Sequence, residues 1–330
     1  MLSTDPAAGR HGCHHEAICY DSDEELLAVA VPFLTDGIAA DEPTVLSLGE
    51  RRAALVRSAL PAGVEVSLAT GGVMYTGPAS AIRSYQQLLA GYRASGARRV
   101  RIVGELPPAH FGSTWDWWAR YESAVNHALD EFPVWCLCTY DRRLAPAAVL
   151  ADVGRTHPWI ATADGRREPS PHYTDPLLFL RENRPGPPDP VQLTAPALEL
   201  TDPSPARARH GVREVDRGLL PADDVDDLVV AVSETVTNAH RYGCPPVRVR
   251  YWTADDRIVV TVSDCGEGPK DPFAGLLPTR DGAEGGLGLW ITFQSCSHVT
   301  MSRDAGSYTL RLTAGNPPAG DILGAVGRKP

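Results

Sequence analysis

Long hydrophobic runs are missing from this chain of 330 residues, because no stretch of eighteen consecutive apolar residues occurs. That absence excludes the usual pattern of a transmembrane helix. The beginning of the chain, MLSTDPAAGRHGCHH, also lacks the apolar segment of a secretory signal peptide. We therefore expect a cytoplasmic protein without a membrane partner.

A surplus of positive charge and a disulfide framework are missing as well. Acidic residues outnumber basic residues by 41 to 31, and the formal net charge is -10. Nucleic-acid binding depends on clustered Lys and Arg, whereas the arginines here are interspersed with acids, so we expect no nucleic-acid partner. The 7 cysteines follow no regular spacing, which favours reduced thiols in a reducing compartment.

The residues that are present are sufficient for two domains, since the chain is long and 43% hydrophobic. Between residues 167 and 196 proline is dense and periodicity is lost, which is typical of an extended linker. No internal repeat of fixed period occurs. We predict an N-terminal domain at 1–165, a linker at 166–190, a second domain at 191–316 and a tail at 317–330.

Helical and strand-like segments alternate in the first domain. Residues 23–40 predict the first helix. Strands are predicted near 43–49, 64–69, 99–106 and 133–141, with helices between them. This alternation predicts an α/β fold in which helices cover the faces of a parallel sheet.

The second domain has a different order of elements. A short helix near 204–218 and a long helix over 223–242 come first. They are followed by the predicted hairpin 245–264, a further helix and two more strands. Helices followed by antiparallel strands predict a two-layer α/β sandwich.

Two polar residues lie one turn apart on the long helix. Apolar residues at spacings of three and four define its buried face, so Glu234 and Asn238 share another face. A carboxylate and a carboxamide in this arrangement can ligate a hydrated metal ion or act as a base. A solvated helix face with an ordinary asparagine near its end fits the same local pattern.

Two glycine clusters follow the long helix. The first directly follows a strand and has the pattern Asp-x-Gly-x-Gly, formed by Asp264, Gly266 and Gly268. The second precedes the last helix and consists of Gly285, Gly286 and Gly288. Glycines at a helix N-terminus let backbone N–H groups approach phosphate oxygens, and a strand-end carboxylate can accept a hydrogen bond from an exocyclic amine. Either cluster alone also fits a plain turn.

The ordered set of three motifs resembles the GHKL ATPases (gyrase, Hsp90, the sensor histidine kinases and MutL) over about residues 191–316. The resemblance implies ATP and Mg²⁺ as cofactors. Asn238 would ligate Mg²⁺, Glu234 would polarise a water or a substrate hydroxyl, and Asp264 would recognise the adenine amine. The remaining implied nucleotide-binding positions are Gly266, Gly268, Gly285, Gly286 and Gly288 around the pocket and its lid, and Thr309, which would share a water with Asp264.

Within this superfamily the domain is most similar to the anti-sigma-factor serine kinases of the switch-protein type, because it ends soon after its last strand. This implies a sigma factor and an anti-sigma antagonist as partners, phosphoryl transfer to Ser or Thr, and a homodimer. Two alternatives are a nucleotide-dependent binding regulator without catalysis and an atypical histidine kinase. The missing histidine-bearing dimerisation helix disfavours the latter, and we interpret His240 as structural or solvent-facing.

The first domain, over about residues 11–165, resembles the MEDS sensory domain of methanogen and methylotroph regulators (DcmR type). The segments HHEAICYDSDEELL, RVRIVGELP, YESAVNHAL and CLCTYD carry this likeness. The resemblance implies a RecA-like fold and a small-molecule ligand. The phosphate-loop pattern G-x-x-x-x-G-K-[ST] does not occur, so a second nucleotide site cannot be argued.

Soft metal ligands are concentrated in the same domain, namely Cys13, His14, His15, Cys19, Cys136 and Cys138. His15 matches the histidine of the MEDS motif. The set is sufficient for zinc or a haem-type iron. However, the spacing C-x₅-C matches no standard zinc knuckle, and cysteine in a buried strand commonly packs as a small hydrophobe. Both interpretations stay open.

Other candidate residues have a structural alternative. The aromatic residues Trp115, Trp117, Trp118 and Tyr121 can line an apolar ligand pocket or pack in the core. Glu105 and Asp141 end two strands, where α/β proteins place their ligands, but both can be ordinary loop carboxylates. Ser113 and His110 form no nucleophile pattern, so a hydrolase triad is not supported.

Overall fold

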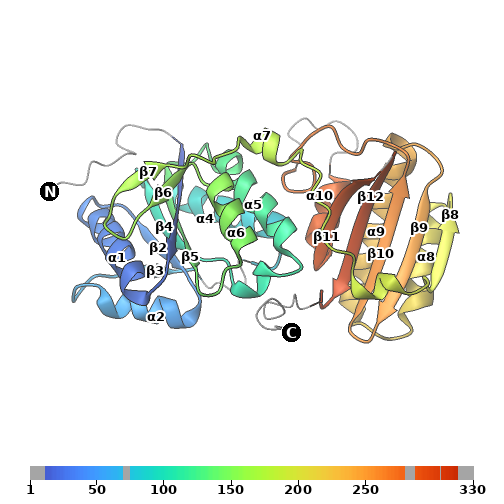
Figure 1. The fold of residues 1–330 in the computed structure, drawn as a ribbon, viewed down its shortest axis with the longest axis horizontal. Helices are drawn as coiled ribbons and strands as arrows, with labels where there is room; N and C mark the ends of the chain where they lie inside the picture. The colour runs from blue at the N-terminus through green and yellow to red at the C-terminus, as the bar shows by residue number, and fades with distance from the viewer. Residues whose placement is uncertain (1–11, 70–74, 279–286, 305, 319–330) are drawn as a thin grey trace, which may run out of the picture. The chain divides into compact units, whose positions relative to one another are not determined.

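The computed structural model describes residues 12–69, 75–278, 287–304 and 306–318 (Figure 1). The chain divides into two compact units, the first formed mainly by residues up to Phe179 and the second mainly by residues from Leu180 onward. Among the described residues, no helix combines the length and the apolar character that crossing a membrane requires.

The first unit is built on a seven-stranded sheet. Its strands, in spatial order, are β3 (Ser67–Leu68), β2 (Thr44–Ser47), β4 (Val100–Gly104), β5 (Val134–Asp141), β1 (Cys13–Tyr20), β6 (Trp159–Ala161) and β7 (Arg167–Pro169). All neighbouring pairs are parallel except β6 and β7. The predicted parallel sheet is confirmed. The sequence analysis did not assign β1, although this strand lies between β5 and β6.

Helices cover the two faces of this sheet. They are α1 (Asp23–Ala39), α2 (Glu50–Ala59), α4 (Pro78–Ala94), α5 (Trp115–Ala128), α6 (Ala147–Thr156) and the single turn α7 (Pro176–Phe179). Helix α1 begins where the Ser22 hydroxyl accepts a hydrogen bond from the Glu25 N–H. Three acidic residues in its first turn face the positive end of the helix dipole.

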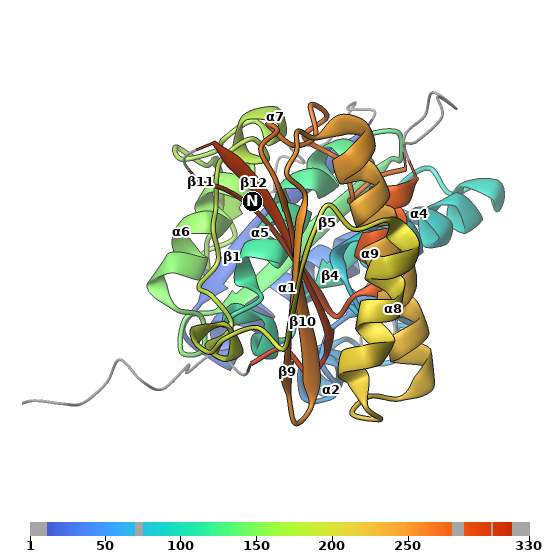
Figure 2. The same cartoon turned by 90° about the vertical axis from the view of Figure 1, so that its right-hand side faces the viewer.

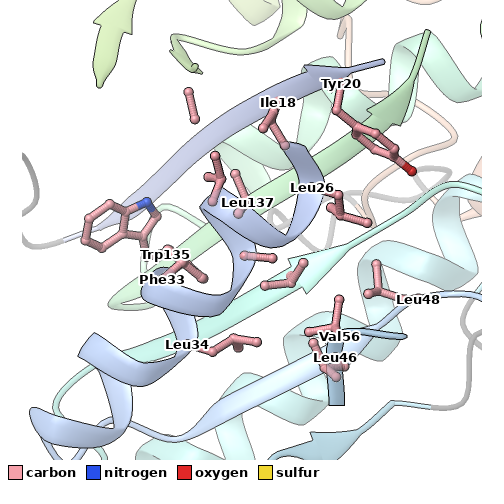
Figure 3. Packing of buried hydrophobic residues seen from close by; sticks show 14 residues of the cluster. Ile18, Tyr20, Leu26, Phe33, Leu34, Leu46, Leu48, Val56, Trp135 and Leu137 are labelled. Atoms are coloured by element: carbon pink, nitrogen blue, oxygen red, sulfur yellow. The ribbon is translucent and has the colours of Figure 1, made fainter. Parts of the chain in front are cut away.

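The main core of the first unit lies between α1 and the sheet. Figure 3 shows Leu26, Phe33 and Leu34 of α1 against Ile18 of β1 and Leu137 of β5. Successive side chains of a strand point to opposite faces. The odd-numbered residues of β1 therefore point to the other face, where α5 and α6 lie.

Part of the predicted linker has regular structure in the first unit. Residues Arg167–Pro169 form β7, which pairs with β6, and Pro176–Phe179 form α7. The Arg167 guanidinium lies over the Trp135 ring at 5.0 Å and donates to the buried Glu16 carboxylate. These contacts attach the start of the proline-rich segment to the central strands.

The second unit is a two-layer α/β sandwich, as predicted. Its five-stranded antiparallel sheet has the order β11 (His298–Asp304), β12 (Ser307–Gly315), β10 (Arg257–Asp264), β9 (Arg248–Ala254) and β8 (Leu198–Thr201). The second layer consists of α8 (Pro205–Asp216), α9 (Ala222–Tyr242) and α10 (Gly288–Ser295). Figure 2 shows α8 and α9 on one side of β9, β10 and β12.

The sequence explains how these helices begin and which face they bury. Ser204 accepts a hydrogen bond from the Arg207 N–H and Pro205 occupies the first turn of α8. In α9, Val225, Leu228 and the other predicted apolar positions are buried against the sheet. This packing leaves the face that carries Glu234 and Asn238 only partly buried.

Candidate functional site

The flank of α9 that carries Glu234 and Asn238 lies directly against the beginning of α10. A Cβ atom added to Gly288, the first residue of α10, would lie 2.6 Å from Glu234 Oε2 and 3.2 Å from Asn238 Nδ2. Only glycine therefore fits at this position without moving Glu234. The carboxylate, the carboxamide and a helix N-terminus are brought together, which is an arrangement suited to a metal-bound phosphate.

Asp264 lies at the end of β10, next to the C-terminus of α9. Its side chain is buried, and Oδ1 accepts the N–H of Gly266 at 2.6 Å and the N–H of Cys244 at 3.2 Å. Both bonds use the same oxygen atom. The carboxylate is thus held in one orientation, from which Oδ2 can accept a hydrogen bond from a ligand.

Three glycines pack tightly around Asp264 and its neighbours. Added Cβ atoms would lie 2.5 Å from Asp264 Oδ1 at Gly243 and 2.7 Å from it at Gly266. Gly268 has φ +76°, and a Cβ there would lie 2.5 Å from the Tyr308 ring. Gly266 and Gly268 were predicted from the sequence. Gly243 was not, because it precedes β9 and contacts Asp264 at the end of β10 only in the folded chain.

The predicted partnership between Thr309 and Asp264 does not agree with the strand register. In the β10–β12 pair, Thr309 lies opposite Ser263, and their hydroxyl groups are 2.9 Å apart. Since neighbouring residues of a strand point to opposite faces, Thr309 lies on the face away from the Asp264 side chain. The Ser307 hydroxyl of β12 donates a hydrogen bond to the backbone carbonyl of Asp264 at 3.2 Å.

Gly285 and Gly286 lie outside the described residues. The exposed His240 donates from Nε2 to the Pro203 carbonyl at 2.9 Å, in keeping with its structural interpretation. Glu234, Asn238 and Gly288 meet at one end of the site, and Asp264 with Gly266 lies beside the C-terminal end of α9.

Two protein-family models match separate parts of the chain. The model of the MEDS domain, described as MEthanogen/methylotroph, DcmR Sensory domain, matches residues 14–158. The model of the histidine kinase-like ATPase domain matches residues 199–314. The chain joins a MEDS domain to a histidine kinase-like ATPase domain. The predicted combination is confirmed.

Relatives of the ATPase domain carry the name serine-protein kinase RsbW. The protein from Bacillus licheniformis is 37% identical over 97 residues, which cover 26% of this chain and 61% of the relative. The protein from Halalkalibacterium halodurans is 30% identical over 95 residues, which cover 26% of this chain and 59% of the relative. The protein from Staphylococcus aureus (strain Newman) is 29% identical over 108 residues, which cover 28% of this chain and 65% of the relative. The chain thus spans about three fifths of the length of these relatives.

A solved structure that matches the chain contains the RsbU and RsbW domains of Rv1364c from Mycobacterium tuberculosis. It has 23% sequence identity, covers 38% of this chain and 33% of that chain, and gives a TM-score of 0.27.

The MEDS domain has a cavity at the carboxyl ends of its strands, where the sequence placed Glu105 and Asp141. Its volume is about 680 Å³, and its lining includes Gly49 at the start of α2, Arg52 and Glu105. Arg52 forms ion pairs with both Glu105 and Asp141. Burial raises the pKa of the Glu105 carboxyl above its ordinary range, although Arg52 acts in the opposite direction. Both carboxylates therefore have a structural partner beside a cavity of ligand size.

The aromatic candidates of the MEDS domain are buried. Trp117 and Trp118 are each 1% exposed and Trp115 is 7% exposed, and all three group with the second compact unit and not with the first. Tyr121 lines a small cavity of about 30 Å³ together with Tyr75 and further residues of β4 and β5.

The cysteine and histidine residues near the start of the MEDS domain do not form one group. His15 points toward α5, and its Nε2 lies 3.2 Å from Cys138 Sγ. His14 points to the opposite face, where it packs on two tryptophan rings. Cys13 and Cys19 share the face of His15 but lie toward the ends of β1. His15 and Cys138, both among the predicted soft ligands, thus lie together, whereas His14 of the same predicted set lies on the other face of the sheet.

The lowered pKa of His110 leads us to expect that acid destabilises the MEDS domain. It lies in the turn η1 (Pro108–Phe111), and burial lowers its pKa to about 4 from the ordinary 6.5. The folded state therefore binds fewer protons than the unfolded state between these values. Stability that is present above pH 6.5 should be lost as the pH falls toward about 4.

We expect His110→Asn to lose less stability than the wild type between about pH 6.5 and pH 4. Urea unfolding at several pH values measures this slope. The exposed His127, replaced by Asn, serves as the control for the substitution itself. Equal slopes in His110→Asn and the wild type would contradict the assignment.

Proposed function

We propose that the ATPase domain binds Mg-ATP along α9, with the phosphates at the beginning of α10 and the adenine at Asp264. The contact of Gly288 with Glu234 and Asn238 carries this proposal. Asn238 would ligate Mg²⁺ through its side-chain oxygen, and the N–H groups at the start of α10 would face the phosphate oxygens. Asp264 Oδ2 would accept a hydrogen bond from the adenine amine.

The same geometry supports phosphoryl transfer to a protein hydroxyl. In such reactions the enzyme mainly positions the reactants and neutralises charge. Glu234 lies beside Asn238, so its carboxylate would be near the terminal phosphate of bound ATP. As a general base it would take the proton of a Ser or Thr hydroxyl while that oxygen attacks the phosphorus and ADP leaves.

We further propose that the protein is an anti-sigma regulatory factor with sensory input. The relatives named serine-protein kinase RsbW support serine kinase activity. The kinase would act on an anti-sigma antagonist, and the protein would sequester a sigma factor. The MEDS domain would supply the signal through a small ligand. A ligand changes the balance between the two partners only if it binds two states of the protein with different affinity.

Calorimetric titration of Mg-ATP into the full chain tests the nucleotide site. Asn238→Ala and Asp264→Asn should each raise the Kd about 10- to 100-fold, because each removes a charge-assisted contact. Asn238→Ala should also lose the Mg²⁺ dependence. The exposed Asp256, replaced by Asn, is the matched control and should bind as the wild type does. Wild-type protein that binds no ATP would overturn the proposal.

A substitution that removes no polar group gives an independent test. In Gly243→Ala the new Cβ would lie 2.5 Å from Asp264 Oδ1 and 2.6 Å from the Ala239 carbonyl, so the carboxylate must move. We expect the Kd for ATP to rise by about 10-fold or more. Gly91→Ala is the control, because its Cβ would meet nothing within 4 Å. Unchanged ATP affinity in Gly243→Ala would show that the position of Asp264 is irrelevant to binding.

A further inference from the structure

Four side chains from separate segments of the MEDS domain converge in its interior. They are His15 of β1, Glu122 of α5, Cys138 of β5 and His157, which follows α6. One ligand atom from each lies within 4.8 Å of the others. His15, Glu122 and His157 are at most 2% exposed. The sequence analysis named only His15 and Cys138.

Hydrogen bonds orient both imidazole rings toward the centre of this group. His15 Nδ1 lies 3.2 Å from Asn126 Oδ1, and His157 Nδ1 lies 3.0 Å from the Val153 carbonyl. Both oxygens are acceptors, since the Asn126 amide nitrogen itself donates to three backbone carbonyls. Each Nδ1 therefore carries the proton, and each Nε2 presents a lone pair, as in metal-bound histidines.

The inner atoms lack the partners that burial requires. Glu122 Oε1 accepts a hydrogen bond from the Tyr140 hydroxyl at 2.7 Å, but Glu122 Oε2 and His157 Nε2 are buried without a hydrogen-bond partner. They lie 3.5 Å apart, and His15 Nε2 lies 3.5 Å from the same carboxylate oxygen. Lone pairs that face one another in a buried site are unfavourable unless a cation lies between them.

Three of the six separations between these ligand atoms have the size that tetrahedral coordination requires. Zinc binds nitrogen and oxygen at about 2.0–2.1 Å and thiolate sulfur at about 2.3 Å, so its ligand atoms lie about 3.3–3.6 Å apart. The observed separations are 3.2 Å for His15 Nε2 to Cys138 Sγ and 3.5 Å for Glu122 Oε2 to each histidine. The other three separations are at most 4.8 Å, so the four side chains need only small adjustments to surround one ion.

We propose that His15, Glu122, Cys138 and His157 bind one tetrahedral divalent metal ion of the zinc class. The Cys138 thiolate and the Glu122 carboxylate balance the two positive charges, and both histidines stay neutral. A site with no net charge is compatible with burial. Binding forms the metal–sulfur bond and releases the thiol proton of Cys138 to solvent.

A small cavity gives the site room for a change of coordination. Its volume is about 30 Å³, and its lining includes His15, Glu122 and Cys138 on one side and Tyr75 and Tyr85 on another. This volume holds about one water-sized molecule. The metal therefore links four segments of the MEDS domain and leaves space for one small additional ligand.

Metal analysis of the full chain, purified without chelator and loaded with Zn²⁺, tests the proposal. We expect about one equivalent of zinc in the wild type and less than about a tenth in Cys138→Ser and His157→Gln. Cys136→Ser is the matched control, because Cys136 lies on the same strand but outside the group, and it should keep the metal. Zinc that persists in both ligand variants, or that is lost equally in the control, would place the metal elsewhere and overturn the assignment.

Titration of metal-free wild-type protein keeps the proposal testable if the variants fail to fold. Co²⁺ should produce the visible absorption of tetrahedral cobalt together with a thiolate charge-transfer band. Zn²⁺ should displace it and raise the Tm by several degrees, because the ion binds the folded state. Absence of both the cobalt spectrum and the Tm shift would show that the four groups share a proton and hold no metal.

Discussion

Replacement of Arg167 by alanine is expected to lower the free energy of unfolding of the MEDS domain by about 3–5 kcal/mol. Arg167 Nε donates to both carboxylate oxygens of Glu16, at 3.1 and 3.0 Å. Glu16 is 0% exposed and lies in the middle of β1. Without the guanidinium, the buried carboxylate would keep His14 as its charged partner among the described residues. The loss of packing on Trp135 adds to the effect.

Urea unfolding of Arg167→Ala beside Arg166→Ala measures this effect. The Arg166 side chain is 69% exposed and pairs with the exposed Asp164 and Glu168, so its removal should change stability by less than about 1 kcal/mol. Adding Glu16→Gln to Arg167→Ala should recover part of the loss, because the buried charge is removed. Equal stability of the two arginine variants would mean that the ion pair between Arg167 and Glu16 does not stabilise the MEDS domain.

The same ion pair explains why β1 was not predicted from the sequence. A strand that contains His14, His15 and Glu16 does not have the apolar character of a buried parallel strand. Its charged and polar side chains find partners that lie far along the chain, such as Arg167 for Glu16 and Glu122 for His15. Such pairings depend on the folded chain and leave no periodic signal.

The proline-rich segment shows a similar limit. Proline content and lost periodicity predicted a linker over 166–190, and much of that segment is indeed irregular. What composition cannot reveal is that Arg167–Pro169 hydrogen-bonds to β6 and that Asp189 binds Arg257 of β10 at 2.9 and 3.0 Å. A short edge strand needs only a few backbone bonds, which residues of almost any type can provide.

The proposed nucleotide site was more accessible to sequence reasoning because its motifs are local. Glu234 and Asn238 share a helix face through their spacing alone, and Asp264 with Gly266 forms a single turn. The partnership predicted between Thr309 and Asp264 disagrees with the structure for a different reason. Its face depends on the register of β12 against β10, and a shift of one residue exchanges the two faces of the sheet.

Glu234→Gln should separate binding from catalysis in the ATPase domain. We expect the Kd for Mg-ATP to stay within about threefold of the wild type, because Asn238 and Asp264 keep their contacts. Phosphoryl transfer to the antagonist should fall about 10²- to 10⁴-fold, since glutamine cannot accept the hydroxyl proton. This expectation rests on the proposed kinase activity.

Single-turnover transfer from radiolabelled ATP to candidate antagonist proteins measures the rate, and calorimetry measures the ATP affinity. Glu199→Gln is the matched control, because Glu199 lies in the same domain on β8 and forms an exposed pair with Arg250. Equal loss of binding and transfer in Glu234→Gln would mean that the carboxylate holds Mg-ATP and does not act as a base. A wild-type protein that binds ATP but phosphorylates no antagonist would favour the alternative, in which the nucleotide orders α10 for partner binding. Glu234 would then act only through its contact with Gly288.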